Sequence, residues 1–130
     1  MKEIKNSRLL IDSDIIIDHL RGTGNLEELI QDSAENSCFI SVISIAEIYS
    51  LLYVNEYEIV NALTSQLKIF NVDSIIAKLA GAYRMNFSKS YFLTIPDAII
   101  AATAKIHNTV LVTKNLKHFP MDDIEKIKPY

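Results

Sequence analysis

The stretch from Arg8 to Leu20, RLLIDSDIIIDHL, predicts the unit from which this fold is built. The apolar run Leu9–Ile11 is short and bounded by polar residues, which is typical of a buried strand in a parallel sheet. Asp12 follows at the end of that strand. Beyond it, apolar residues at helical spacing predict a helix that begins near Ile15 and ends at Gly22. The unit is therefore a strand, an acidic turn and a short helix.

The two acids of this turn are expected to differ in role. In open α/β sheets, ligands bind beyond the carboxyl ends of the strands, so Asp12 is expected to point into a binding crevice. We expect it to make no hydrogen bond to the helix. Because an unpaired buried carboxylate is costly, Asp12 then needs a cation or a hydrogen-bond donor. Ser13 or Asp14 is predicted to cap the helix, and for Asp14 capping and chemistry remain equally open.

The composition predicts one globular domain over residues 1–130, with 49% hydrophobic and 22% charged residues. The start, MKEIKNSR, lacks the apolar segment of a signal peptide, and no run reaches the roughly 18 apolar residues of a membrane span. We therefore expect a cytoplasmic protein without membrane contact. Cys38 is the only cysteine, which excludes an internal disulfide and a thiol cluster for metal. A net charge of -3 argues against a broad basic face, so any nucleic-acid contact must be local.

The rest of the chain alternates strand-like and helix-like segments without a linker or repeat, which indicates an α/β fold. The predicted strands are Cys38–Ser44, Ile69–Val72, Thr109–Val112 and a marginal edge strand in the IEKI of residues 124–127. The predicted helices cover residues 25–35, 44–52, 56–67 and 73–86, with Asp73 as a cap, and a central helix starts at Pro96. Residues 87–94, FSKSYFLT, are predicted to be a surface loop.

Two further acids, Glu47 and Asp97, are predicted in the first turns of helices that follow the second strand and the 87–94 loop. Each has a structural explanation. Ser44 and Glu47 have the S-x-x-E spacing of a capping box, and the helix macrodipole favours Asp97 in a first turn. Together with Asp12, however, they would meet at one edge of a parallel sheet. Because clustered carboxylates repel, this arrangement indicates a divalent cation.

Four motifs, LLIDSDIIIDHL, SVISIAEI, IPDAIIAATA and LVTKNLKHF, follow one another in an order and at a spacing that resemble the PIN domain, specifically the VapC-type toxin ribonucleases of toxin–antitoxin pairs. The resemblance covers Leu9 to Phe119. It implies a three-layer α/β/α sandwich around a parallel sheet of four or five strands. It also implies an endoribonuclease that depends on Mg²⁺ or Mn²⁺ and uses Asp12, Glu47 and Asp97, a neutralising antitoxin, and a homodimer.

The last motif departs from the family pattern, because many relatives carry a fourth acid after the final core strand. Here Asn115 and His118 stand in that segment. An asparagine carbonyl can still bind a hard cation or orient a water, so Asn115 joins the candidate catalytic residues. His118 receives no role, since imidazole is a poor partner for magnesium beside carboxylates.

These residues predict a specific chemistry, hydrolysis of an RNA phosphodiester by a water that the metal makes more acidic. Asp12 and Asp97 are expected to hold the ion, and Glu47 to hold it through water or to orient the nucleophile. Asp14 and either Thr113 or Asn115 are expected to support these ligands by hydrogen bonds. The candidates for holding RNA phosphates are Arg84, Lys89, Lys114 and Lys117, and Tyr91 or Phe92 is a candidate for stacking on a base.

Two other functions stay open. Asp12-Ser13-Asp14 also matches the D-x-D start of haloacid-dehalogenase-type phosphatases, in which the first Asp is phosphorylated, but the sequence shows no counterpart of that family's later lysine and acidic pair. The other alternative is a PIN-like binding module with a degenerate site, and the missing fourth acid favours it. Binding of manganese would separate this module from the nuclease.

Overall fold

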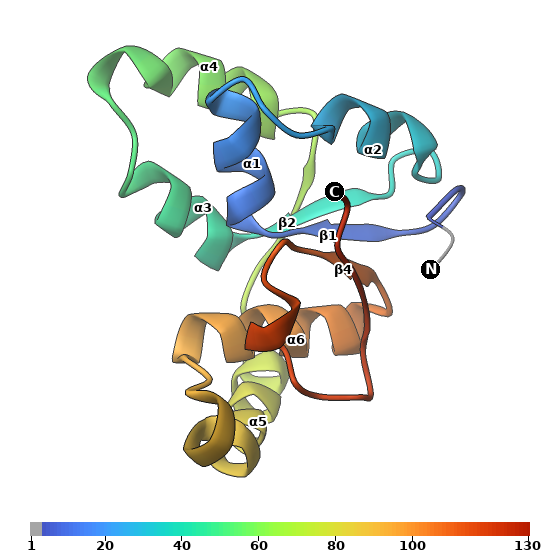
Figure 1. Ribbon diagram of the computed structural model, residues 1–130, viewed down its shortest axis with the longest axis vertical. Coiled ribbons are helices and arrows are strands. Elements are labelled where there is room, and N and C mark those ends of the chain that lie inside the picture. The colour runs from blue at the N-terminus through green and yellow to red at the C-terminus, as the bar shows by residue number, and fades with distance from the viewer. Residues whose placement is uncertain (1–3) are drawn as a thin grey trace.

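A parallel sheet of five strands forms the centre of the computed structural model, which describes residues 4–130 apart from the side chains of residues 88–91 (Figure 1). The strands are β1 (Leu9–Ile11), β2 (Cys38–Ser41), β3 (Lys68–Phe70), β4 (Val110–Val112) and β5 (Glu125–Ile127). Their order is β3-β2-β1-β4-β5, and each neighbouring pair is parallel. The predicted parallel sheet and its marginal last strand are confirmed, with β1 at the centre and β5 at an edge.

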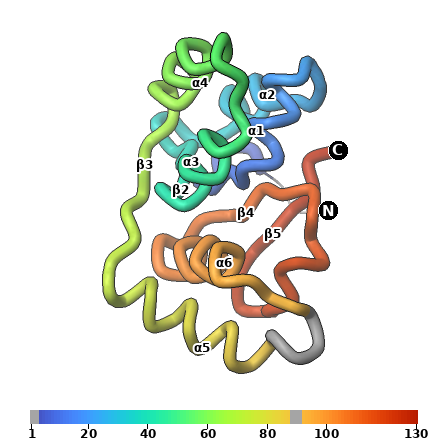
Figure 2. The backbone as a smooth tube through the Cα atoms, turned by 90° about the vertical axis from the view of Figure 1, so that its left-hand side faces the viewer, coloured from blue at the N-terminus to red at the C-terminus, as the bar shows by residue number. Residues whose placement is uncertain are grey.

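Helices cover both faces of this sheet. The helices are α1 (Ser13–Leu20), α2 (Leu26–Asp32), α3 (Val42–Tyr49), α4 (Tyr57–Thr64), α5 (Ser74–Tyr91) and α6 (Ile95–His107), with short 3-10 turns η1 (Val54–Glu56) and η2 (Leu116–His118). Figures 1 and 2 show α1 to α4 on one side of the sheet and α5 and α6 on the other. The predicted three-layer α/β/α sandwich is therefore confirmed. Within the described part of the chain, no helix combines the length and the apolar character that crossing a bilayer requires.

The strand β1 shows why a fully apolar run suits this architecture. Leu9 and Ile11 are buried in the hydrophobic cluster beneath α1 to α4, whereas Leu10 is buried in the cluster beneath α5 and α6. Successive side chains of a strand point to opposite faces, and here both faces are covered. The apolar residues before Asp12 thus fix the strand at the centre of the fold.

The second strand is shorter than predicted. It ends at Ser41, whose Oγ accepts a hydrogen bond from the Ile43 amide (3.1 Å) and caps α3. The predicted capping box of Ser44 and Glu47 is therefore wrong, and Glu47 lies beyond the first turn. The β-branched residues after Ser41 favour a strand locally, but the serine cap starts the helix first.

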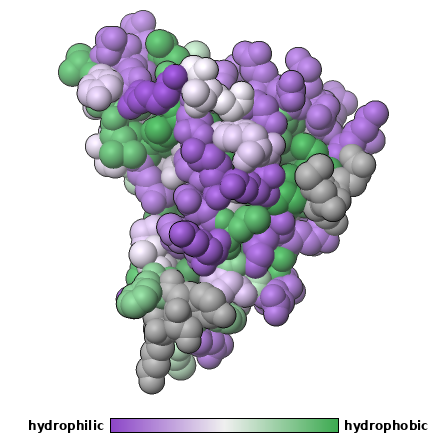
Figure 3. All heavy atoms as spheres, viewed as in Figure 1, coloured by the Kyte–Doolittle hydropathy of each residue, from purple (hydrophilic) through white to green (hydrophobic). Residues whose placement is uncertain are grey.

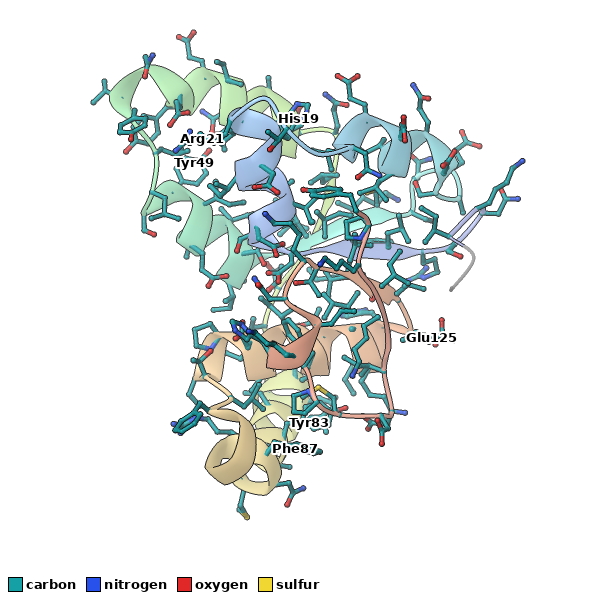
Figure 4. All side chains as sticks on the ribbon, viewed as in Figure 1. His19, Arg21, Tyr49, Tyr83, Phe87 and Glu125 are labelled. Atoms are coloured by element: carbon teal, nitrogen blue, oxygen red, sulfur yellow. The ribbon has the colours of Figure 1, made fainter. Side chains whose placement is uncertain are left out.

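The predicted loop over residues 87–94 is also wrong, because α5 runs to Tyr91. Asp73 caps this helix as predicted, since its Oδ1 accepts from the Ile76 amide (2.9 Å). The rings of Tyr83 and Phe87, one helical turn apart, lie 6.5 Å from each other and extend the packed face of the helix (Figure 4). The helix has ended at Phe92, which has a positive φ of 53°. The predicted loop contacts of Lys89 and Tyr91 lie outside the described side chains.

Candidate active site

Asp12 lies at the carboxyl end of the central strand, where the sheet order reverses. Its amide donates to the Val112 carbonyl (3.0 Å), which continues the pairing of β1 with β4. Its Oδ1 accepts from the Ser13 amide (2.8 Å), so Asp12 itself caps α1. The prediction that Ser13 or Asp14 caps this helix is wrong, as is the expectation that Asp12 makes no helix hydrogen bond. The helix begins directly after Asp12, so no other residue is available for the cap.

Thr113 brings the two acids of the first motif together. It follows β4, is fully buried, and its Oγ1 lies 2.8 Å from Asp12 Oδ2 and 3.4 Å from Asp14 Oδ2. A hydroxyl has one proton, so this single donor serves both carboxylates. The hydroxyl oxygen accepts in turn from the Asn115 amide (3.1 Å), which fixes its orientation. Thr113 therefore lies against Asp12, and its predicted role in supporting the metal ligands stays a prediction.

Asp14 is held mainly through one carboxylate oxygen. Its Oδ2 accepts from the Lys114 amide (2.9 Å) and from Asn115 Nδ2 (3.2 Å), in addition to its contact with Thr113. Its Oδ1 is buried, and although burial raises the pKa of this carboxylate, hydrogen bonds from the Lys114 and Ile15 backbone amides act to lower it. Asn115 therefore enters the site as a donor to Asp14.

Glu47 and Asp97 reach the same region from two other helices. Glu47 projects from α3, and its Oε1 accepts from Ser13 Oγ (3.3 Å). Asp97 lies in the first turn of α6, as predicted, where its amide donates to Thr94 Oγ1 (3.3 Å). The Oδ2 atom of Asp97 lies 3.6 Å from His118 Nδ1, an ion pair when the imidazole is protonated. Both carboxylates are half-buried.

Burial raises the pKa of all four acids, and the charges of Asp14 and Asp97 add to it. Burial, then the charges of Asp14 and Asp97, raise the pKa of Asp12 to about 7. Burial also raises the pKa of Asp14, of Glu47 and of Asp97. For Glu47 the charges of Asp97 and Asp14 add to burial, and for Asp97 the nearby His118 opposes it. The charges of Asp14 and Asp97 thus act on acids at three different helices, which indicates that the four carboxylates lie near one another.

This donor set fits a hard divalent cation in its chemistry. Magnesium and manganese prefer carboxylate oxygens, and an ion would offset the repulsion between these carboxylates. Among the described side chains, however, no three acidic, imidazole or thiol groups are arranged as a ready set of ligands. On the face shown in Figure 3, hydrophilic side chains gather across the middle of the molecule, between the two helix layers.

The side chains predicted to bind RNA phosphates differ in whether they already form contacts within the fold. Lys114 Nζ pairs with Asp18 Oδ2 (2.6 Å), and Arg84 Nε donates to the Leu93 carbonyl (2.9 Å). Both side chains are therefore engaged within the fold. Lys117 is exposed in η2, next to His118, and the side chain of Lys89 lies outside the described part.

Sequence reasoning missed the supporting role of three residues. Ser13 donates to Glu47, His118 faces Asp97, and Tyr130 joins Lys114 on Asp18, with its hydroxyl donating to Asp18 Oδ2 (2.6 Å). A signal existed for Ser13, since it directly follows the acid at the strand end. No local sequence pattern predicts that His118 contacts Asp97 of α6 or that Tyr130 contacts Asp18 of α1.

Comparison with known proteins identifies the family of this chain. Residues 9–123 match the family model for the PIN domain. Ribonuclease VapC10 of Mycobacterium tuberculosis is 32% identical over 123 residues, which cover 93% of this chain and 91% of that protein. A chain of the toxin-antitoxin complex from Klebsiella pneumoniae is 30% identical with a TM-score of 0.74, over 94% of this chain and 98% of that one. DNA-bound VapBC from Salmonella typhimurium shares the fold, with a TM-score of 0.77 at 22% identity over 93% of this chain and 97% of that one. The chain therefore belongs to the PIN-domain family, which it shares with the VapC ribonucleases.

Proposed function

We propose that this protein is an endoribonuclease that depends on a divalent metal ion and acts as the toxin of a toxin–antitoxin pair. The observation that carries the proposal is that Thr113 joins Asp12 to Asp14 and Ser13 joins Glu47 to the same turn, with Asp97 near enough for its charge to act on Asp12. The relative from Mycobacterium tuberculosis is named a ribonuclease, which supports RNA as the substrate. The similar chain from Klebsiella pneumoniae belongs to a toxin-antitoxin complex, which supports an antitoxin as the partner.

In this proposal Asp12, Asp97 and Glu47 hold Mg²⁺ or Mn²⁺. When bound, the ion offsets negative charge on the scissile phosphate and lowers the pKa of an attacking water. The protein keeps the carboxylates in place for this task. Thr113 holds Asp12 by its hydroxyl, and Ser13 holds Glu47, so neither acid has to be ordered when RNA arrives.

RNA and protein partners require different surfaces. For RNA, the exposed Lys117 lies on η2 next to His118, which faces Asp97, and with a net charge of -3 such contacts stay local. For an antitoxin or a second copy of the chain, exposed apolar side chains gather around η1 and α4, namely Leu51, Tyr53, Val54, Tyr57 and Ile59. A homodimer and a place of action in the cytoplasm, where the RNA lies, belong to the same proposal.

A phosphoryl-enzyme mechanism lacks support, because the family match assigns the first motif to a PIN domain.

The test is cleavage of RNA by purified protein with and without Mn²⁺. Asp12→Asn, Glu47→Gln and Asp97→Asn remove charge at nearly constant shape, so each is expected to lower the cleavage rate by about 100-fold or more while the circular dichroism spectrum stays unchanged. A chelator should stop the wild-type reaction. Asp122→Asn, which changes an exposed acid of the β4–β5 connection, is the control and should cleave normally.

Two results would contradict the proposal. If two of the three variants kept the wild-type rate, the assignment of the site would be wrong. If the wild-type protein bound no manganese in calorimetry and cleaved no RNA, the protein would be a PIN-like binding module with a degenerate site.

A further inference from the structure

Lys114 contacts two different acids of α1, one through its backbone and one through its side chain. Its amide donates to Asp14 Oδ2 (2.9 Å), which lies within the candidate site. Its ammonium group pairs with Asp18 Oδ2 (2.6 Å), one helical turn further along α1. The backbone of Lys114 therefore touches the candidate site, whereas its charge rests on an acid outside it.

The side chain of Lys114 is long enough for a different partner. Its Cα lies no more than about 4.4 Å from Asp14 Oδ2, because an N–Cα bond of about 1.46 Å adds to the hydrogen bond of 2.9 Å. The flexible four-carbon stem of a lysine can bring the ammonium back over that distance. Burial raises the pKa of Asp14, and the positive charge of Lys114 is among the causes that oppose this rise. The ammonium is thus close enough to act on the acids of the site.

Tyr130 helps to hold this ammonium at Asp18. The Tyr130 hydroxyl donates to Asp18 Oδ2 (2.6 Å), the same oxygen that pairs with Lys114. The centre of the tyrosine ring lies 6.0 Å from Lys114 Nζ, which is at the limit of a cation–π contact. Although burial alone would raise the pKa of Asp18, the hydrogen bonds from Lys114 and Tyr130 lower it. Asp18 therefore stays charged and keeps its hold on the ammonium.

The turn between α1 and α2 provides a seat for Tyr130. Gly24 has a φ of +80°, and a Cβ at this position would lie 2.7 Å from the Tyr130 hydroxyl oxygen, so a larger residue would displace the ring. Asn25 Nδ2 donates to the Pro129 carbonyl (3.4 Å) and ties the same two segments together. Exposed ion pairs contribute little to stability by themselves. Stability alone does not account for a seat built to support the pair of Lys114 and Asp18.

We propose that Asp18 and Tyr130 keep the Lys114 ammonium out of the metal site, so that a metal ion does not have to displace it. The proposal rests on the proposed function, which assigns the ion to three carboxylates that attract any cation within reach. An ammonium on a short tether competes for them at a high effective concentration. Asp18 and Tyr130 are then positioning residues that act through Lys114.

The test is calorimetric titration of Mn²⁺ alone into the purified full-length protein, with the circular dichroism spectrum of each variant as a check of folding. Tyr130→Phe removes the hydroxyl without changing any charge, and it should weaken manganese binding by about 3-fold or more, because Asp18 loses a charge-assisted hydrogen bond. Asp18→Asn removes the partner of the ammonium itself and should weaken binding by about 10-fold.

Rescue by a second substitution separates competition from a general effect on structure. Lys114→Met keeps a long side chain and removes the competing charge, and alone it should bind manganese within about 2-fold of wild type. Tyr130→Phe/Lys114→Met should bind like Lys114→Met, because nothing remains for the tyrosine to hold. Lys117→Met is the matched control, since it removes the same charge from the same segment. Tyr130→Phe/Lys117→Met should keep the defect of Tyr130→Phe.

The outcomes that contradict the proposal are distinct. Wild-type affinity in Tyr130→Phe would overturn it, and so would an equal loss with and without Lys114→Met, which would give Tyr130 a structural role only. Equal rescue by Lys117→Met would reduce the effect to net charge and overturn it as well. In each of these cases a loss of manganese binding in Asp12→Asn would leave the proposed function standing, whereas wild-type affinity in Asp12→Asn would overturn both.

Discussion

Asp12 and Asp73 occupy equivalent positions in two copies of the same local unit, yet their surroundings differ. Each aspartate lies just beyond a parallel strand and caps the helix that follows, Asp12 through the Ser13 amide and Asp73 through the Ile76 amide. Asp12 is only 6% exposed and shares a buried threonine with another acid. Asp73 is exposed. Helix capping therefore accounts fully for the surroundings of Asp73 but only in part for those of Asp12.

The difference comes from the place of each strand in the sheet. Asp12 follows β1, which lies between β2 and β4, so the turn after β4 brings Thr113 against its carboxylate. Asp73 comes after β3 at the edge of the sheet, where only β2 is a neighbour. In a parallel sheet the carboxyl ends of central strands collect side chains from several elements, and those of edge strands do not. Position in the sheet, more than residue type, separates the proposed catalytic acid Asp12 from the cap Asp73.

Apart from replacing an acid, the change expected to have the largest effect on the difference between Asp12 and Asp73 is the removal of the Thr113 hydroxyl. Thr113→Val keeps the shape of the side chain and deletes the hydroxyl that Asp12 and Asp14 share. Because hydrogen bonds that orient metal ligands are worth about 10–100-fold in activity or affinity, metal-dependent cleavage should fall by about that factor. Thr113→Ser keeps the hydroxyl and should restore most of the rate. Equal rates for the valine variant and wild type would show that this hydroxyl does not prepare the site.

A smaller effect concerns stability and pH. The pKa of Asp12 is raised to about 7 in the folded protein, so folding favours its protonated form. The stability that this provides is fully present below about pH 4, the pKa of an unfolded aspartate, and is lost as the pH rises through about 7. Metal-free wild type should therefore melt lower at pH 8 than at pH 5, by about 5 °C.

The matched variants decide whether Asp12 causes that difference. Asp12→Asn should lose most of the change in melting temperature between the two pH values, with Asp73→Asn as the charge-matched control. An unchanged pH dependence in Asp12→Asn would assign the effect to other groups.

The local sequence was sufficient to predict those features of the fold and the candidate site that depend on interactions between residues close in the chain. Burial of Leu9–Ile11 on both faces follows from an apolar run, and Asp12 at a strand end follows from the residue that stops it. The same reasoning placed Asp97 in a first helical turn and Asp73 at a cap. The catalytic role of these acids stays a prediction.

The remaining features depend on contacts that the local sequence does not contain. Asn115 meets Asp14 across 101 positions of the chain, and that meeting requires β4 to pair with β1. The length of β2 was overestimated because Val42 and Ile43 favour a strand locally, whereas the cap at Ser41 acts first. Long-range pairing therefore determined which polar residues became partners.

The most direct test of the central claim is the rate of Mn²⁺-dependent RNA cleavage by the matched pair Asp12→Asn and Asp73→Asn. Both variants replace an aspartate by asparagine, which is also a good helix cap, so the loss of helix stability should be small and similar. We predict that Asp12→Asn cleaves about 100-fold more slowly than wild type or worse, and that Asp73→Asn cleaves within about 2-fold of wild type. Equal rates for the two variants, whether both normal or both lost, would contradict the claim that the centre of the sheet turns a capping aspartate into part of the active site.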